Sequence, residues 1–261
     1  MSTVTASQVK ELRDQTGAWM MDCKRALEES GGDLEAARRL LRERGMASAA
    51  KRAERSTPEG LVGYMIDGDV GAMVAVGCET EPVSKNDEFQ AFAEKVLRAV
   101  EDQGADAVEE LEEERQQVVG RLGENIRVVG ATRIQAGDGE SIVAYVHPPA
   151  NKIGSMVRFK GDPALARDLA LHIAFARPRY LARDEVAQAE VDAERDVLLR
   201  TEDVLSKPEN VREKIVEGRL QKWFADSVLL EQEWFRGGGT TVQQELGSLE
   251  VLEFTVYALG A

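Results

Sequence analysis

The strongest constraint on the fold is a change of hydrophobic period at Gly60. Before this residue, apolar side chains recur at helical spacing. After it they alternate over residues 62–66 and 72–76, which predicts two strands joined by a hairpin turn at Asp67-Gly68-Asp69. Helical and alternating blocks then follow one another along the chain. Each helix must bury one stripe and each sheet one face, so we predict an α+β fold with mainly antiparallel sheets.

Three short helices are predicted over residues 5–44. Thr5 and Gln8 form a capping-box pattern, and Gly17 suits the left-handed conformation that often ends a helix. The third helix is expected to begin at Asp33 as N-cap and to end before Gly45. The following segment turns basic and ends in Ser-Thr-Pro, which predicts a frayed helix leading into a linker. We therefore assign residues 1–45 to a helical module and residues 46–59 to a linker.

The remainder is predicted to form a core with an inserted hairpin. Two helices are expected over 87–103 and 105–122, a second antiparallel sheet from strands 126–134, 141–147 and 152–159, a helix from Pro163 that ends before Pro178, a short helix over 242–246, and a final strand over 249–259 that returns to one of the sheets. Between them, two amphipathic helices fold back at Ser206-Lys207-Pro208. The predicted parts are a core N-subdomain of residues 60–140, a core C-subdomain of residues 141–183 and 231–261, and an inserted helical hairpin of residues 184–230.

Composition restricts the classes of function. The chain has 33 basic and 47 acidic residues and a formal net charge of -14, which opposes binding to nucleic acid or an anionic membrane surface. No apolar run is long enough to cross a bilayer, and the first residues lack a signal peptide pattern, so we predict a cytoplasmic protein. Residues 1–55 carry 11 basic and 9 acidic residues against 22 and 38 in the rest, which supports a separate first module.

Side chains that carry catalysis are scarce. Cys23, Cys78, His147 and His172 do not have the spacing of a metal site or a catalytic motif. We therefore predict that the chain is not an enzyme and has no catalytic residue, metal or cofactor. His172 lies on a predicted helix and is more typical of a structural histidine, and His147 is expected at the surface. A nucleophilic role for Cys78 stays open as an alternative.

Two segments look suited to meet a partner. The stretch from Cys78 to Asp87 joins a predicted strand to a predicted helix, and core packing does not explain its polar atoms and its proline. The alternative is a plain connection in which Asn86 or Asp87 caps the helix. In the small bundle Met20 and Met21 cannot both point inward, and exposed methionine is an adaptable contact residue. Here the alternative is that one methionine lies in the core and the other is incidental.

These segments also carry a family resemblance. Residues 16–27, Thr-Gly-Ala-Trp-Met-Met-Asp-Cys-Lys-Arg-Ala-Leu, closely resemble the Thr-Gly-Ala-x-Met-Met-Asp-Cys-Lys-x-Ala-Leu signature of the translation elongation factor Ts family. Residues 78–86 resemble the family's second signature. Further matching segments follow in the family's order: Gly123-Glu124-Asn125-Ile126, Ile153-Gly154, residues 172–180 and Val216-Glu217-Gly218-Arg219. The resemblance therefore covers essentially the whole chain.

The resemblance implies a guanine nucleotide exchange factor for the GTPase elongation factor Tu. Such a factor binds the GDP-bound GTPase and disrupts its Mg²⁺ and phosphate sites, so that GDP leaves and GTP binds. The implied architecture is a ubiquitin-associated-like three-helix module, a core of two α+β subdomains and a coiled-coil hairpin inserted in the second subdomain. The second subdomain would also engage the GTPase's third domain. The implied partner-binding residues are Arg13, Met20, Met21 and Lys24 against a helix of the GTPase domain, Thr80, Glu81, Pro82 and Val83 near the helices that flank its nucleotide, and Ile153, Gly154 and His172 on the core's contact surface.

One departure concerns the second signature. The family typically has Thr-Asp-Phe-Val, whose aromatic ring acts as a wedge, whereas this chain has Thr80-Glu81-Pro82-Val83. Either Pro82 and Val83 make a shallower wedge, or the other contacts carry more of the exchange. A non-exchanging binding module or assembly chaperone of the same GTPase is therefore an alternative. The hairpin is a candidate for forming a homodimer or a 2:2 complex, or for touching only the GTPase.

Overall fold

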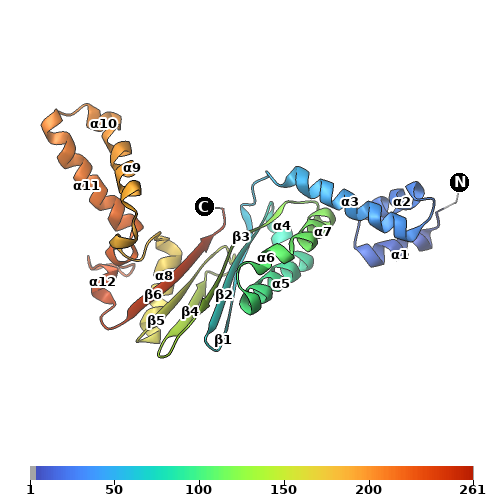
Figure 1. Ribbon diagram of the computed structural model, residues 1–261, viewed down its shortest axis with the longest axis horizontal. Helices are drawn as coiled ribbons and strands as arrows, with labels where there is room; N and C mark the ends of the chain where they lie inside the picture. The colour runs from blue at the N-terminus through green and yellow to red at the C-terminus, as the bar shows by residue number, and fades with distance from the viewer. Residues whose placement is uncertain (1–3, 261) are drawn as a thin grey trace.

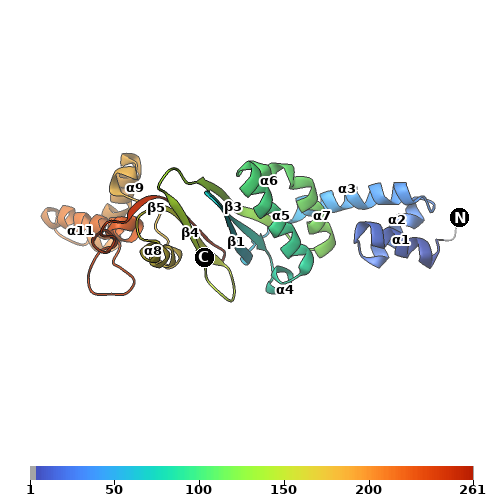
Figure 2. The same cartoon turned by 90° about the horizontal axis from the view of Figure 1, so that it is seen from below.

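The computed structural model describes residues 4–260, and the chain is elongated. A helical module lies at one end and a helical hairpin at the other, with two β-sheets between them (Figure 1). From the module toward the hairpin, the core has four layers: helices α5 to α7, a first sheet, a second sheet and helix α8 (Figures 1 and 2). The predicted α+β class is confirmed.

The helical module consists of α1 (Ala6–Thr16), α2 (Met20–Glu29) and α3 (Leu34–Arg52). The predicted capping box of Thr5 and Gln8 is present, and Gly17 ends α1 with a φ of 67°. Leu12, Cys23 and Leu27 are fully buried in the centre of the bundle. The predicted end of the third helix before Gly45 is wrong, because α3 continues to Arg52 and passes close to a later helix at that glycine.

The first sheet contains β1 (Glu59–Asp67), β2 (Val70–Cys78) and β3 (Ile126–Gln135), all antiparallel, with β2 in the centre. The short α4 (Glu81–Ser84), then α5 (Asp87–Gln103), α6 (Ala107–Glu110) and α7 (Glu112–Leu122) lie between β2 and β3 along the chain. The prediction that β3 belongs to the second sheet is wrong, because β3 pairs with β2 from Cys78 opposite Ile126 onward. The helix predicted over 105–122 is broken at Leu111 into α6 and α7.

The second sheet has β4 (Ser141–Val146), β5 (Ile153–Lys160) and β6 (Glu250–Ala258), so the final strand pairs with β5. Helix α8 (Pro163–Ala176) covers its outer face. The inner faces of the two sheets share one apolar cluster, in which Val62 and Met73 of the first sheet meet Met156 of the second. A Cβ atom at Gly154 would lie 2.9 Å from the Val62 Cγ1 atom and 3.0 Å from the Tyr145 carbonyl oxygen, so only glycine fits where the sheets meet.

The hairpin is formed by α9 (Gln188–Leu199) and α11 (Glu209–Ser227), with the one-turn helix α10 (Glu202–Leu205) near the predicted fold-back point. Short 3₁₀ turns at Arg183–Glu185 and Leu229–Glu231 and the helix α12 (Val242–Glu245) lie at its base. Val216, Leu220 and Phe224 of α11 are buried, whereas Val197 of α9 and Leu205 of α10 are 60% and 52% exposed. Within residues 4–260, no helix combines the length and the hydrophobicity needed to cross a membrane.

Candidate functional site

The loop that carries Pro82 is a short projecting turn fixed at both ends. It leaves the buried end of β2 at Cys78, forms the single turn of α4 and reaches Asn86, whose side chain accepts a hydrogen bond from the Glu88 N–H at 2.9 Å and so caps α5. Figure 2 shows α4 at the edge of the molecule. Thr80, Glu81 and Pro82 are exposed, while Val83 packs against the core of the first sheet. The turn thus offers its tip to a partner from a rigid base.

Two carboxylates hold the start of this turn. Glu124 accepts hydrogen bonds from the Thr80 N–H at 3.0 Å and from the Thr80 hydroxyl at 2.5 Å. In the opposite direction, Glu79 accepts a hydrogen bond from the Asn125 N–H at 2.6 Å. Bonds to an ionised acceptor are stronger than neutral ones. The segment before α4 and the segment before β3 are therefore clamped together just beyond the paired ends of β2 and β3.

Asn125 extends the clamp to the end of the linker. Its side chain is fully buried, and its amide nitrogen donates a hydrogen bond to the Arg55 carbonyl at 2.7 Å. In the sequence, Glu124 and Asn125 belong to a segment that resembles the family, and no pattern predicts a role for Glu79. The sequence does show that Glu79 and Glu124 adjoin segments without a strand or helix pattern. Their pairing with the opposite segment depends on the register of β2 on β3, which the sequence does not reveal.

Removing the Glu124 carboxylate should loosen the turn. We expect Glu124→Ala to lower the free energy of unfolding by about 1–2 kcal/mol, because Thr80 loses two hydrogen bonds to a charged acceptor. Amide hydrogen exchange over residues 79–86 should accelerate at the same time. Glu109→Ala, which truncates an exposed glutamate of α6, is the matched control. Unchanged exchange in the loop would contradict the clamp.

Cys78 belongs to the base of the turn rather than to its exposed tip. Its thiol is fully buried and donates a weak hydrogen bond to the Thr80 carbonyl at 3.3 Å. Burial, assisted by the Glu124 carboxylate, raises the pKa of Cys78 to about 12. A thiol with this pKa stays protonated at neutral pH, which argues against the nucleophilic role left open for this residue.

Thiol labelling checks this burial. Because burial raises the pKa of both Cys23 and Cys78, the folded protein should resist iodoacetamide at pH 8 and should take up label on both cysteines only after unfolding. Mass spectrometry before and after denaturation measures the difference. Rapid labelling of Cys78 in the folded protein would contradict the protected base of the loop.

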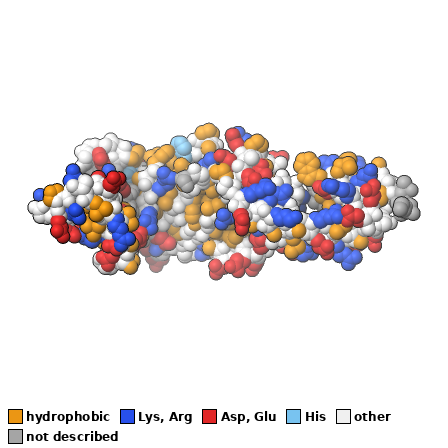
Figure 3. Space-filling model, turned by 90° about the horizontal axis from the view of Figure 1, so that it is seen from above, with side chains coloured by type: hydrophobic (Ala, Val, Ile, Leu, Met, Phe, Trp, Pro, Cys, Tyr) orange, Lys and Arg blue, Asp and Glu red, His pale blue; other side chains and the backbone are white. Residues whose placement is uncertain are grey.

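The second candidate surface lies on the helical module. Met20 and Met21 begin α2 and are 51% and 61% exposed, so the alternative that one of them fills the core is wrong. Lys24, one turn later on α2, is exposed and lies 3.7 Å from Glu28, and Arg13 is exposed in the last turn of α1. Figure 3 shows apolar side chains among Lys and Arg on the module. Flexible thioethers next to cations form a soft contact surface.

The third predicted group lies mostly inside the protein. Ile153 is half-buried at the start of β5, Gly154 is buried between the sheets, and His172 on α8 is only 2% exposed. The Nε2 atom of His172 lies 2.9 Å from the Oε1 atom of Gln232, and its ring stacks on Trp234. Burial lowers the pKa of His172, which keeps the ring neutral. A direct contact of His172 with a partner stays a prediction.

Exposed aromatic rings near His172 escaped the sequence reasoning. Phe175, one turn further along α8, is 49% exposed and meets the ring of His147 edge to face at 4.9 Å. Phe235 is 40% exposed and lies against Trp234. Phe175 falls within a matching segment of the sequence, but helical period alone did not separate it from the buried stripe of α8. Phe175 and Phe235 are therefore exposed apolar side chains close to the buried His172.

Comparisons with known proteins agree on one family. The model of a family described as Elongation factor TS matches residues 79–261. Elongation factor Ts of Deinococcus deserti is 38% identical over 264 residues, which cover 97% of this chain and 98% of the relative. The protein of the same name from Chlorobium phaeobacteroides is 35% identical over 290 residues and covers all of both chains.

A third relative, Elongation factor Ts of Rhodospirillum rubrum, is 39% identical over 269 residues, which cover 94% of this chain and 86% of the relative. The full-length match to the Chlorobium protein includes the exposed methionines of α2 as well as the clamped loop, and the family model includes the loop. Because these matches span the chain from the helical module to the last strand, the chain belongs to the elongation factor Ts family.

Proposed function

We propose that this protein is a guanine nucleotide exchange factor for elongation factor Tu and acts in the cytoplasm. It binds the GDP-bound GTPase, accelerates GDP release and so permits GTP to bind during translation elongation. The observation that carries the proposal is the exposed turn of Thr80, Glu81 and Pro82, held by Glu124 and placed on the same chain as the exposed methionines of α2. Family membership supports the identity of the partner.

The proposed mechanism is mechanical rather than covalent. A GTPase holds GDP through backbone N–H groups around the phosphates and through a Mg²⁺ ion. A partner that displaces the neighbouring helices weakens both interactions. The turn at residues 80–83 suits this role because it is rooted in β2 and α5, so the contact deforms the GTPase in preference to the turn. No acid, base or nucleophile of this chain takes part.

Three surfaces have distinct roles in the proposal. The module surface, made of Arg13, Met20, Met21 and Lys24, binds a helix of the GTPase domain and supplies affinity. The loop surface, made of Thr80, Glu81, Pro82 and Val83, lies near the helices that flank the nucleotide. The third surface lies on the C-subdomain. It includes Ile153, Gly154 and His172, and the exposed side chain of Phe175 makes its apolar contact with the GTPase. Light scattering of the free protein tests whether the hairpin forms a homodimer, and light scattering of the mixture with elongation factor Tu tests the 2:2 complex.

Thermodynamic reciprocity tests the exchange function at equilibrium. If the protein weakens GDP binding to elongation factor Tu by some factor, bound GDP must weaken the protein's own binding by the same factor. We expect titrations against nucleotide-free and GDP-loaded elongation factor Tu to differ by at least about tenfold in dissociation constant. Equal affinities would favour the non-exchanging chaperone, since a ligand that binds both states equally shifts neither.

Pro82 is the residue at which the family's wedge differs. Pro82→Phe should change the maximal rate of GDP release while leaving binding intact, because the exposed position at the start of α4 accommodates a larger side chain. The rate at saturating protein, measured with fluorescent GDP, reports the effect. Pro82→Ala, which removes the proline ring without adding an aromatic side chain, separates the effect of the phenyl ring from the loss of proline. An unchanged rate in Pro82→Phe would tell against the wedge role of this turn.

A further inference from the structure

Helix α3 belongs to two bodies at once. Its Ala37 is buried in the core of the helical module, whereas its Ala49 is buried with Val118 and Val119 of α7 in the core of the first sheet. The helix is continuous from Leu34 to Arg52. A helix resists bending because its backbone hydrogen bonds must break at a kink. Helix α3 is therefore a rigid connection between the module and the core, and not a flexible linker.

Helix α3 crosses α7 at a pair of glycines, one on each helix. A Cβ atom at Gly120 would lie 3.1 Å from the Gly45 Cα atom, so the two helix backbones touch at this point. A glycine inside a helix costs about 1 kcal/mol relative to alanine, and the close crossing explains why both helices carry one here. Next to the crossing, Arg42 of α3 pairs with Glu113 of α7 at 2.7 Å.

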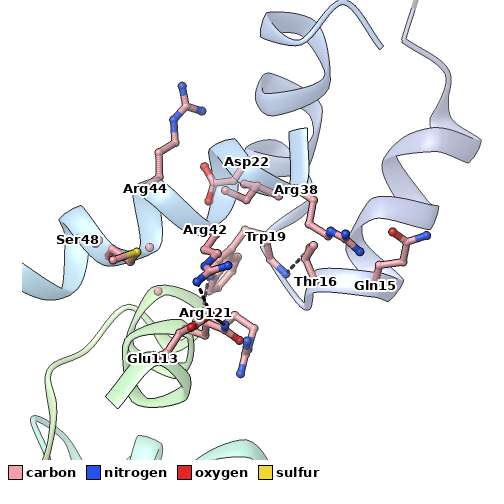
Figure 4. Close-up of a pocket in the computed structure, with 16 residues that line it drawn as sticks. Gln15, Thr16, Trp19, Asp22, Arg38, Arg42, Arg44, Ser48, Glu113 and Arg121 are labelled. Carbon is pink, nitrogen blue, oxygen red and sulfur yellow. Dashed lines mark hydrogen bonds and ion pairs between the residues drawn. The ribbon is translucent and has the colours of Figure 1, made fainter. Parts of the chain in front are cut away.

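Trp19 makes a second attachment, at the residue of α7 that follows Gly120. Its indole N–H donates a hydrogen bond to the Arg121 carbonyl at 2.9 Å. Arg121 lies in the last turn of α7, where carbonyls have no partner within the helix, so the indole satisfies a free acceptor. Figure 4 shows Trp19 and Arg42 meeting Glu113 and Arg121 of α7.

Arg121 continues this path toward the loop surface. Its guanidinium pairs with Glu88, which lies in the first turn of α5, and the N–H of Glu88 is the one that Asn86 caps. Asn86 ends the loop that carries Pro82. The exposed methionines of α2 and the exposed turn of α4 are thus connected through packed helices and direct polar contacts.

We propose that Trp19, Arg121 and the Gly45–Gly120 crossing are positioning residues, which hold the module surface at a fixed spacing from the loop surface. This inference rests on the proposed exchange function. With both surfaces preset, a single GTPase molecule meets them together, and binding does not bear the entropic cost of ordering the module. The contacts between the module and α7 therefore affect the affinity for the GTPase, while the loop surface sets the rate of nucleotide release in the complex.

The attachment can be weakened without unfolding either body. The module has its own core around Leu12 and Leu27, separate from the core of the first sheet. Between the module and α7 lies a cavity of about 540 Å³. The arginines that line it are paired with carboxylates, Arg38 with Glu35 and Arg42 with Glu113, so the cavity is a gap in the packing rather than an unneutralised anion site.

The test uses two separate variants of the full chain, Trp19→Ala and Gly120→Val, and two readouts. First, labels on Lys10→Cys in the module and Asp102→Cys in the core report their separation; both positions are exposed, whereas Cys23 and Cys78 are buried. We expect one narrow distance distribution in the parent and a broad one in each variant. Second, GDP release is measured against protein concentration. The half-saturating concentration should rise by about tenfold, with the maximal rate unchanged.

Two further variants separate positioning from general damage. Trp19→Phe keeps an aromatic ring but removes the N–H, so it should give an intermediate distance distribution and an intermediate half-saturating concentration. Tyr64→Ala removes an exposed aromatic ring from β1 and should change neither. An unaltered distance distribution in Trp19→Ala and Gly120→Val, or an unaltered half-saturating concentration despite a broad distribution, would overturn the inference. Failure of the parent protein to accelerate GDP release would overturn the proposed function instead, while the distances would still report docking.

Discussion

Replacing Met20 and Met21 together with glutamate should weaken binding of elongation factor Tu by at least about thirtyfold. Both side chains are more than half exposed and form the apolar part of the module surface. Two buried carboxylates at the contact would lack partners, and their desolvation would add to the loss of apolar contact. The fold should persist, because acidic residues in the first turn of a helix interact favourably with its dipole.

Titration calorimetry with nucleotide-free elongation factor Tu measures this loss of affinity. Val129→Glu provides the matched control, since it introduces the same carboxylate at an apolar side chain of β3 that is 53% exposed. The control should bind like the parent protein. A double variant of Met20 and Met21 with parental affinity would show that the module surface does not meet the GTPase.

The second large effect is on stability. Gly154→Val should lower the free energy of unfolding by about 3 kcal/mol, at the upper end for overpacked cores. A Cβ atom at this position would lie 2.8 Å from Val146 Cγ2 and 2.9 Å from Val62 Cγ1, with a backbone carbonyl 3.0 Å away. Since Val62 belongs to the other sheet, relief of the clash requires the sheets to separate.

Urea unfolding followed by circular dichroism measures the loss. Gly218→Val on α11 is the control, because a Cβ atom there meets no atom within 4 Å, and its effect should stay within about 0.5 kcal/mol. Parental stability in Gly154→Val would contradict the packing of the two sheets. The expected loss would explain Gly154 by the fold alone, without a contact to the GTPase.

Local patterns were sufficient for most individual elements. The caps at Thr5 and Asp33 and the hairpin turn at Asp67-Gly68-Asp69 depend on residues within one turn of each other, so the sequence predicts them correctly. The sheet that receives β3 could not be predicted in this way. Alternation shows which face of a strand is buried, but it does not identify the neighbouring strand.

Gly45 illustrates a second limit. By sequence it is a helix end, since glycine lowers helix propensity. In the folded chain it stays within α3, because Gly120 of α7 passes over it. The clamp of the loop has the same character, since Glu124 and Thr80 are brought together only by the pairing of β3 with β2. The sequence located the exposed turn, and only tertiary structure revealed what holds it.

His172 shows why a matching motif does not establish a contact. The resemblance places it on the contact surface, yet the folded chain surrounds it with Trp234 and Gln232. The helical pattern puts His172 beside the buried stripe of α8, but burial on the remaining side comes from the segment after the hairpin, which is 60 residues away. That arrangement depends on how the inserted hairpin returns to the core.

Release of fluorescent GDP from elongation factor Tu, followed after rapid mixing with excess protein, tests the central claim most directly. The exchange mechanism predicts a release rate that rises with protein concentration to a plateau at least about tenfold above the spontaneous rate. The same mixture, examined by size-exclusion chromatography, should contain the complex. A stable complex that releases GDP at the spontaneous rate would contradict the exchange mechanism. The remaining function would then be that of a non-exchanging binding module or assembly chaperone of the same GTPase.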